Sequence, residues 1–444
     1  MRTWIKTPLA ILADDSVGGL VVEDGIIDEC LPSGGVPAVP CDDVLDASEH
    51  VVLPGLINTH HHFYQTLTRA YGPSLDKELF DWLKTLYPVW AGLTPEYLDV
   101  ATRLALAELL LSGCTTAADH HYVFPGGLEE AVDIQAGAAR DMGVRVTLTR
   151  GSMNLSVDDG GLPPVTVVQD GDVILADSAR VIDAFHDSAA GSMTQIALAP
   201  CSPFSVTREI MSDTAALAAD RNVRLHTHLA ETEDENAFCT EMFGCRPLDY
   251  LEQVGWLNDR TWLAHGIHFT PDEISRLGTA GVGIAHCPGS NMVLASGLCP
   301  AIDLERAGAP VGLGVDGSAS EDASNLMQEV RQALQIQRLR YGAASVSHKD
   351  VLRWATAGSA RCLGRDDIGT IAVGKQADLA MFKLDEPRFS GAGDPLAALI
   401  LCGAHRADRV MVGGDWRVVD GAIAGLDIYA LMARHRDAAR ALIS

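Results

Sequence analysis

Three consecutive histidines, His60, His61 and His62, directly follow a short apolar stretch of the chain. On an extended strand, residues two apart point to the same side, so His60 and His62 can reach one metal ion while His61 points away. Imidazole nitrogens are common ligands of zinc and of other divalent metals. The run predicts part of a metal site, although a solvated polar strand end would show the same pattern.

Three further polar clusters end apolar stretches later in the chain. His226 and His228 share a face, so their spacing does not decide which of them would bind a metal. His265 and Asp316 each end another apolar stretch. A single aspartate in such a place is usually a helix cap. Four clusters of this kind in succession favour a metal centre over four unrelated turns.

The elements that must position these residues are short apolar segments alternating with amphipathic ones. The apolar segments predict strands over residues 51–57, 115–119, 144–149, 195–200, 223–228, 261–265, 281–286 and 311–316. The amphipathic segments predict helices over residues 94–113, 128–142, 173–185, 207–220, 271–277 and 325–338.

This alternation predicts an α/β fold with a closed (β/α)8 barrel of the TIM type. A doubly wound open sheet is the alternative, but no G-x-G-x-x-G motif follows the first predicted strand. A barrel carries its chemistry at the carboxyl ends of its strands, and all four polar clusters lie at such ends.

The two ends of the chain consist of short strand-like pieces separated by tight turns. We therefore expect residues 1–53 and 366–444 to form one small β-sandwich domain beside a barrel domain over residues 54–365. An apolar helix predicted over residues 426–443 would either pack on the barrel or serve a subunit interface.

The composition excludes several classes of partner and compartment. The formal net charge is −26, which disfavours binding to nucleic acid polymers and to anionic membranes. The 10 cysteines form no C-x-x-C pair, which favours free thiols in a reducing compartment. No signal peptide and no membrane span is apparent, so we expect a cytoplasmic location.

The chain resembles the amidohydrolase superfamily, and within it the branch of cytosine, guanine and triazine deaminases. The matching motifs are Pro54–His62, His226–Glu231, Leu263–Gly266, Ala285–Asn291, Gly314–Gly317 and Gly369–Leu379.

This resemblance implies that His60, His62, His228 and Asp316 hold one divalent metal, and so it favours His228 over His226. Zinc suits these ligands best, and ferrous iron fits the same ligand logic. Two-metal members have a carboxylated lysine at the end of the fourth strand. Here that position is Pro200-Cys201, so a single metal is expected.

The resemblance also implies that Glu231, His265 and Asp316 are catalytic. The metal would lower the pKa of a water molecule, which then attacks a ring carbon carrying an amino group while Asp316 accepts its proton. Glu231 would donate a proton to the adjacent ring nitrogen, and His265 would stabilise the attacking oxygen. Glu231 could instead be a carboxylate that favours the start of a helix.

Five residues are candidates for binding the substrate. A glutamine amide can pair with a lactam edge, and aromatic side chains can stack on a flat heterocycle. The long segment 63–93, the run 119–125 and the fourth strand end contain the candidates, which are Gln65, Trp82, His121, Tyr122 and Cys201. The alternatives are that Trp82 anchors its loop and that Cys201 fills space.

The segments 60–70 and 119–125 most resemble those of 8-oxoguanine deaminases, which convert 8-oxoguanine and water to urate and ammonia. Hydroxyatrazine ethylaminohydrolases and the isoxanthopterin or guanine deaminases are the alternatives. A more remote one is a non-catalytic scaffold of the same fold. We expect a small neutral heterocyclic substrate and, because members of this branch are often dimers or larger, a homo-oligomer.

Overall fold

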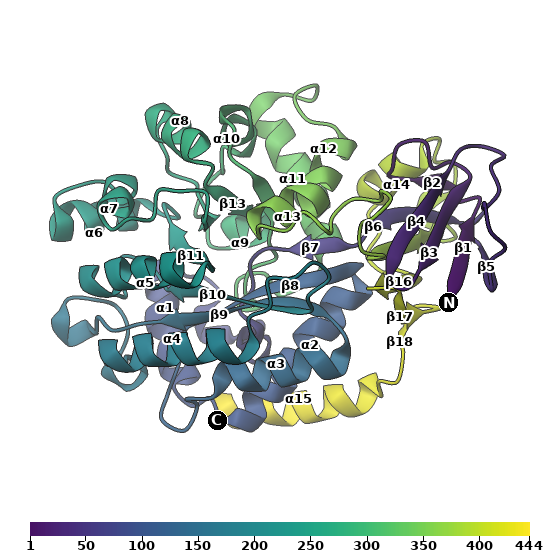
Figure 1. The fold of residues 1–444 in the computed structure, drawn as a ribbon. Helices are drawn as coiled ribbons and strands as arrows, with labels where there is room; N and C mark the ends of the chain where they lie inside the picture. Colours follow the sequence, from purple (N-terminus) through teal and green to yellow (C-terminus); the bar gives the residue numbers. More distant parts are fainter.

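The computed structural model describes residues 1–444, and its centre is a closed barrel of eight parallel strands (Figure 1). They pair in the order β10-β11-β12-β13-β14-β7-β8-β9. Their bounds are β7 (Leu56–Asn58), β8 (Cys114–His121), β9 (Arg145–Ser152), β10 (Thr194–Pro200), β11 (Arg224–Leu229), β12 (Thr261–His265), β13 (Gly283–His286) and β14 (Val311–Leu313). The predicted barrel is confirmed, and each predicted strand overlaps one of these.

Helices surround the barrel and connect its strands. The α-helices are α1 (Leu79–Trp90), α2 (Pro95–Leu111), α3 (Ala131–Met142), α4 (Gly171–Phe185), α5 (Arg208–Arg221), α6 (Glu233–Phe243), α7 (Pro247–Gln253), α8 (Pro271–Ala280), α9 (Pro288–Val293), α10 (Ala301–Ala307), α11 (Leu326–Tyr341), α12 (His348–Arg353), α13 (Ser359–Cys362), α14 (Pro395–Leu401) and α15 (Ile428–Ile443). Shorter turns are η1 (Phe63–Thr68), η2 (Gly72–Ser74), η3 (Val157–Asp159), η4 (Val165–Val167), the π-helical η5 (Trp354–Gly358) and η6 (Pro387–Phe389).

Helix α2 illustrates how local sequence sets these boundaries. The side chain of Thr94 accepts a hydrogen bond from the backbone N–H of Tyr97, and Pro95 occupies the first helical position. After the helix, Gly113 has a φ of +97° and turns the chain into β8. The cap, the proline and the glycine stop are all readable from the sequence.

The two ends of the chain form two sheets beside the barrel, on the right in Figure 1. One sheet has the order β4-β3-β1-β5, with β1 (Arg2–Lys6), β3 (Gly19–Glu23), β4 (Ile26–Leu31) and β5 (Asp43–Asp46). The other has the order β18-β17-β16-β15-β6-β2, with β2 (Ala10–Ile11), β6 (His50–Pro54), β15 (Leu379–Lys383), β16 (Arg409–Val412), β17 (Asp415–Val419) and β18 (Ala422–Ile423).

Side chains from both sheets share one apolar core. Ile5 and Leu20 from the first sheet lie in it together with Val52 and Leu379 from the second. The predicted small β-sandwich built from both chain ends is therefore confirmed.

The single strand predicted over residues 51–57 is in fact two strands, divided at Gly55. β6 pairs with β15 in the small domain, whereas β7 pairs with β8 and β14 in the barrel. A Cβ atom at Gly55 would lie 2.2 Å from Oγ1 of Thr115, so the chain can pass this close to β8 only with glycine. This junction leads directly into the histidine run.

The C-terminal helix α15 lies along α2 and η1 (yellow in Figure 1). Its Leu431 and Ala438 belong to the main core, and His435 Nε2 lies 3.1 Å from Thr66 Oγ1. Packing on its own barrel, one of the two alternatives for this helix, is therefore confirmed. None of the helices is both long enough and apolar enough to span a membrane.

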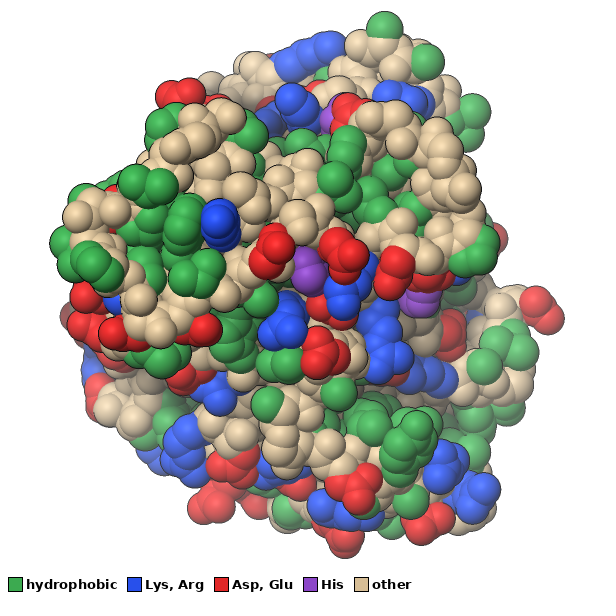
Figure 2. All heavy atoms as spheres, turned by 90° about the vertical axis from the view of Figure 1, so that its right-hand side faces the viewer, with side chains coloured by type: hydrophobic (Ala, Val, Ile, Leu, Met, Phe, Trp, Pro, Cys, Tyr) green, Lys and Arg blue, Asp and Glu red, His purple; other side chains and the backbone are tan.

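The face on the small-domain side carries acidic and basic side chains in close alternation (Figure 2). The 10 cysteines are all free, as the sequence predicts.

We expect Gly55→Ala to lower the free energy of unfolding by about 1–3 kcal/mol, because the added methyl group must displace Thr115 or the β6–β7 connection. Denaturant unfolding measures this change. Gly137→Ala in α3 is the matched control, since its Cβ would meet nothing within 4 Å; it should stabilise by about 0.4–1 kcal/mol. Equal stability of the two variants would contradict the close approach at Gly55.

Candidate active site

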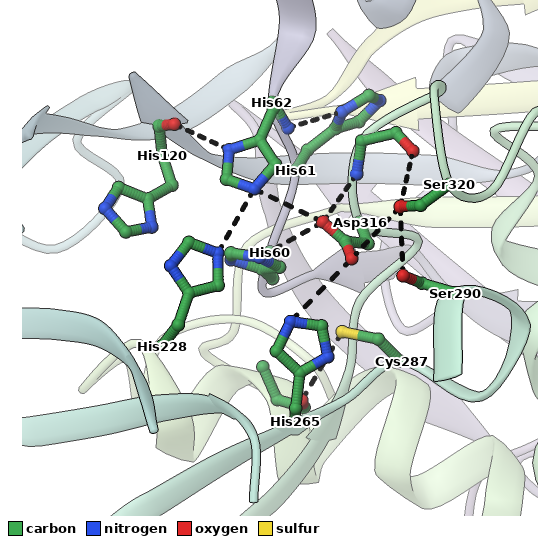
Figure 3. Close-up of polar contacts among 12 residues, drawn as sticks. His60, His61, His62, His120, His228, His265, Cys287, Ser290, Asp316 and Ser320 are labelled. Carbon is green, nitrogen blue, oxygen red and sulfur yellow. Dashed lines mark hydrogen bonds and ion pairs between the residues drawn. The ribbon is translucent and has the colours of Figure 1, made fainter. Parts of the chain in front are cut away.

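Four side chains converge at the carboxyl end of the barrel (Figure 3). His60 and His62 follow β7, His228 lies in β11, and Asp316 follows β14. Three separations are each 3.3 Å: His60 Nε2 to Asp316 Oδ1, His62 Nε2 to Asp316 Oδ1, and His62 Nε2 to His228 Nε2.

This spacing fits a single metal ion. Ligand atoms placed tetrahedrally at zinc–nitrogen and zinc–oxygen bond lengths are roughly 3.3 Å apart. In addition, the Nε2 atom of His60 is buried and has no hydrogen-bond partner. Buried polar atoms rarely remain unpaired, so this nitrogen is available to a ligand.

The second ring nitrogen of each imidazole is held from behind. His62 Nδ1 donates to the carbonyl oxygen of His120 at 2.7 Å, and His228 Nδ1 donates to that of Cys201 at 2.6 Å. His60 Nδ1 lies 2.8 Å from Nε2 of His226. The three Nε2 atoms are thus left for the shared point, and His226 lies behind His60 rather than at that point.

Charge states in the cluster are those that metal binding requires. Burial lowers the pKa of His60 and of His228 well below the usual range, which favours neutral rings. Burial raises the pKa of Asp316, but the imidazoles of His60 and His62, whose Nε2 atoms each lie 3.3 Å from its Oδ1, outweigh it and hold that pKa well below its ordinary value. The carboxyl group is therefore ionised.

Two further titratable groups adjoin the cluster. His265 Nε2 lies 3.4 Å from Glu231 Oε2 and 3.8 Å from Asp316 Oδ2, while His265 Nδ1 lies 2.9 Å from Asn291 Oδ1. Burial raises the pKa of Glu231. Burial lowers the pKa of His265, but the carboxylates of Glu231 and Asp316 outweigh it and raise that pKa.

The backbone at three strand ends adopts the left-handed conformation without glycine. Ala230, His265 and Asp316 have φ values of 53°, 68° and 64°. Each such residue costs about 1–3 kcal/mol, and such strain clusters at functional sites. Here it turns the chain sharply where the strands end and directs Glu231, His265 and Asp316 toward one another.

A small cavity lies beside these groups. Four of the five predicted substrate-binding residues line it: Gln65, Trp82, Tyr122 and Cys201. Its other lining residues include Leu79, Leu83, Phe204, Leu294 and Ser320, together with His62, His228, Glu231, His265 and Asp316. No lysine or arginine lines the cavity.

The fifth predicted contact, His121, lies outside the cavity. Its ring packs edge-on against Tyr64 and Phe124, at centroid distances of 5.5 and 4.9 Å. Side chains alternate along β8, so His120 points into the barrel, where its Nε2 donates to the Ala199 carbonyl, and His121 points away. The structure does not support a substrate contact for His121.

The sequence did not reveal several residues of the site. Leu79, Leu83, Phe204 and Leu294 are ordinary apolar residues from three separate segments, and no local pattern distinguishes them from core residues. Asn291 lies in a recognised motif, but its contact with His265 depends on how α9 packs against β12.

Comparison with known proteins agrees with this geometry. The model of the Amidohydrolase family matches residues 51–417. An 8-oxoguanine deaminase from Pseudomonas aeruginosa is 67% identical over 446 aligned residues, which cover 100% of this chain and 99% of the relative. A hydroxydechloroatrazine ethylaminohydrolase from a Pseudomonas species is 37% identical, covering 87% of this chain and 81% of the relative.

Solved structures share the whole architecture. The atrazine chlorohydrolase of Arthrobacter aurescens, in complex with zinc, superposes with a TM-score of 0.93 at 31% identity, covering 98% of this chain and 100% of the other. The matched segment includes the histidine run, Glu231, His265 and Asp316. The chain belongs to the amidohydrolase family.

Proposed function

We propose that this protein is a metal-dependent deaminase that converts 8-oxoguanine and water to urate and ammonia. The observation that carries the reaction type is the set of converging ligand atoms with Glu231 and His265 beside it, at the wall of a small cavity. The full-length similarity to an 8-oxoguanine deaminase supports the choice of substrate.

His60, His62, His228 and Asp316 are the residues that would hold the metal. When bound, such a metal supplies the Lewis acidity that activates water for attack on a ring carbon. Zinc is the favoured ion because of this ligand set and because the related chlorohydrolase was solved with zinc; ferrous iron suits the same ligands. β10 ends at Pro200, with Cys201 next and no lysine there, which supports a single metal.

The two oxygens of Asp316 have separate roles in this proposal. Oδ1 faces His60 and His62, whereas Oδ2 faces His265 and accepts a hydrogen bond from Ser320. Oδ1 would serve the metal, and Oδ2 would accept the proton of the attacking water. His265 lies between this oxygen and Glu231, where it can stabilise charge on the attacking oxygen.

Glu231 would be the proton donor. Its buried carboxyl group has a raised pKa, which keeps a proton available for transfer. Protonation of the ring nitrogen next to the attacked carbon prevents negative charge from building up on the ring. The water oxygen then forms the new C–O bond, and the proton accepted by Asp316 would pass to the amino group. The C–N bond breaks, ammonia leaves, and the remaining hydroxyl proton would return to Glu231 as the carbonyl group forms.

Gln65 is the candidate residue for hydrogen bonding to the polar edge of the substrate ring. Both its amide oxygen and its amide nitrogen are buried without hydrogen-bond partners. The amide packs so closely on Gly317 that a Cβ atom there would lie 1.9 Å from the glutamine oxygen. A lactam edge, with adjacent C=O and N–H groups, would satisfy both amide atoms at once.

The rest of the cavity suits a flat neutral ring. Trp82 donates its indole N–H to the carbonyl oxygen of Ala319 at 3.2 Å, so its exposed contribution is an apolar face. Leu79, Leu83, Phe204 and Leu294 add further apolar surface. Because no lysine or arginine lines the cavity, a phosphorylated nucleotide would lack the cationic partners that usually bind phosphate.

A substrate panel tests the proposal directly. Metal-loaded protein is assayed for ammonia release with 8-oxoguanine, guanine, isoxanthopterin and cytosine, and for alkylamine release with a hydroxy-triazine. We expect 8-oxoguanine to have the highest kcat/KM of the panel. Preference for the triazine would instead indicate an ethylaminohydrolase, and turnover of none of the five would contradict the proposed substrate class.

Glu231→Gln should lower kcat by about 10²–10⁴-fold, because the amide cannot donate the proton that the ring nitrogen needs. The fold and the metal content should be retained, since Glu231 is not among the proposed ligands. Glu233→Gln is the matched control: this carboxylate lies two residues away but is exposed and pairs with His268. Wild-type turnover in Glu231→Gln would exclude it as proton donor.

His228→Ala should lose most of its bound metal after dialysis against buffer, because one of the four proposed ligand atoms is removed. Metal content measured by elemental analysis checks this expectation, with wild-type protein treated in parallel. Chelation of the wild type should abolish turnover, and added zinc should restore it. Full metal occupancy in His228→Ala would contradict the ligand assignment.

A further inference from the structure

The three proposed imidazole ligands differ in what holds them from behind. His62 and His228 each donate Nδ1–H to a backbone carbonyl, which can only accept a hydrogen bond. Their tautomers are therefore set by the backbone itself. The partner of His60 Nδ1 is instead a side chain, the Nε2 atom of His226 at 2.8 Å. An imidazole nitrogen can accept or donate, so the tautomer of His60 depends on that of His226.

The other nitrogen of His226 decides between the two possibilities. His226 Nδ1 lies 2.8 Å from the carbonyl oxygen of Trp262, so this nitrogen must carry a proton. In a neutral ring the Nε2 atom of His226 is then an acceptor, and His60 Nδ1 must be the donor. The Nε2 atom of His60, which is buried and has no hydrogen-bond partner, consequently presents its lone pair to the ligand cluster.

The position of His226 is itself fixed by Trp262. The two rings are stacked, with centroids 4.3 Å apart and planes 14° from parallel. The indole N–H of Trp262 donates to the carbonyl oxygen of Thr59 at 3.0 Å. Thr59 immediately precedes His60 in the chain. Hydrogen bonds therefore close a loop from His60 through His226 and Trp262 back to the residue before His60.

We propose that His226 is a positioning residue that fixes the tautomer and orientation of His60, and thereby sets the affinity of the site for its metal. His226 does not contact the metal position, because its Nε2 is occupied by His60 Nδ1 and its Nδ1 by a carbonyl. This inference rests on the proposed metal site. Outer partners of this kind typically change metal affinity by about 10–100-fold.

Removing the His226 acceptor should favour the tautomer of His60 that cannot bind a metal. With an apolar side chain at position 226, the Nδ1–H of His60 has no partner in a fully buried position. The ring can relieve this by moving its proton to Nε2, where Asp316 Oδ1 lies 3.3 Å away and can accept it. A protonated Nε2 has no lone pair for a metal, so binding must first reverse the shift.

The test is zinc affinity of the metal-free protein, measured by competition with a chromogenic chelator and without any substrate. His226→Leu should weaken zinc binding by about 10–100-fold. His226→Gln should remain within about threefold of wild type, because its amide oxygen can accept from His60 as Nε2 does. His226→Met, which also lacks a strong acceptor, replaces the leucine variant if that variant does not fold.

A matched control separates positioning from general packing. His286→Leu removes another buried strand-end imidazole, one whose Nδ1 has no hydrogen-bond partner and whose Nε2 lies 3.5 Å from Gln337 Nε2 rather than beside a proposed ligand. Its zinc affinity should equal that of wild type. His228→Gln should lose zinc as His228→Ala does, because a true ligand is not replaced by an amide acceptor.

Two results would overturn the assignment. One is a His226→Leu protein with a lower unfolding temperature in the metal-free state but unchanged zinc affinity, which would make His226 a packing residue. The other is a His226→Gln protein that binds zinc as weakly as the leucine variant. By contrast, zinc binding by the wild type without ammonia release from the substrate panel would count only against the proposed substrate.

Discussion

The structure depends on one constraint: a group of imidazole and carboxylate side chains is buried, with the lone pairs of several of its atoms directed at one point. Unpaired polar atoms in such a place are costly, and neighbouring lone pairs repel. His60, His62 and Asp316 are almost wholly excluded from water, yet the Nε2 atom of His60 has no hydrogen-bond partner in the protein. A cation at the shared point would satisfy all of these atoms together. The same cluster therefore destabilises the metal-free protein and favours metal binding.

The barrel is suited to this task because its strands supply rigid partners from behind. Carbonyl groups at the ends of β8 and β10 orient His62 and His228, and a side-chain relay through His226 orients His60. The left-handed backbone conformation at three strand ends turns the side chains of Glu231, His265 and Asp316 toward the same space. The stability of the surrounding core offsets this local strain. The rigid strand ends also hold the cavity at a fixed position relative to the proposed metal ligands. A ring bound against Gln65 would therefore lie beside Glu231 and His265.

Much of the fold and part of the candidate site could be predicted from the sequence. Apolar segments of strand length alternate with capped helices, and this pattern led directly to the barrel. The period of two in a strand placed His60 and His62 on one side, and it would also have placed His121 opposite His120 had it been applied there. The prediction of one continuous strand over residues 51–57 was wrong, because the apolar character of this segment does not reveal that Gly55 separates strands of two different sheets. The apolar wall of the cavity was missed since leucine and phenylalanine in a pocket resemble those in any core.

The sequence by itself determined the fold class and the chemical type of the site, because hydrophobic periodicity and the residue types at strand ends are local properties. The set of four proposed ligands came from the resemblance to the amidohydrolase superfamily. The spacing of His226 and His228 leaves their roles open, and only the tertiary structure shows that their side chains have different partners. Both lie on the same face of β11, and their difference arises from contacts with β7, β10 and β12, which are distant in sequence. The orientation of Gln65 and the exclusion of His121 from the cavity have the same origin: a side chain's partners depend on which other segments the closed barrel brings beside it.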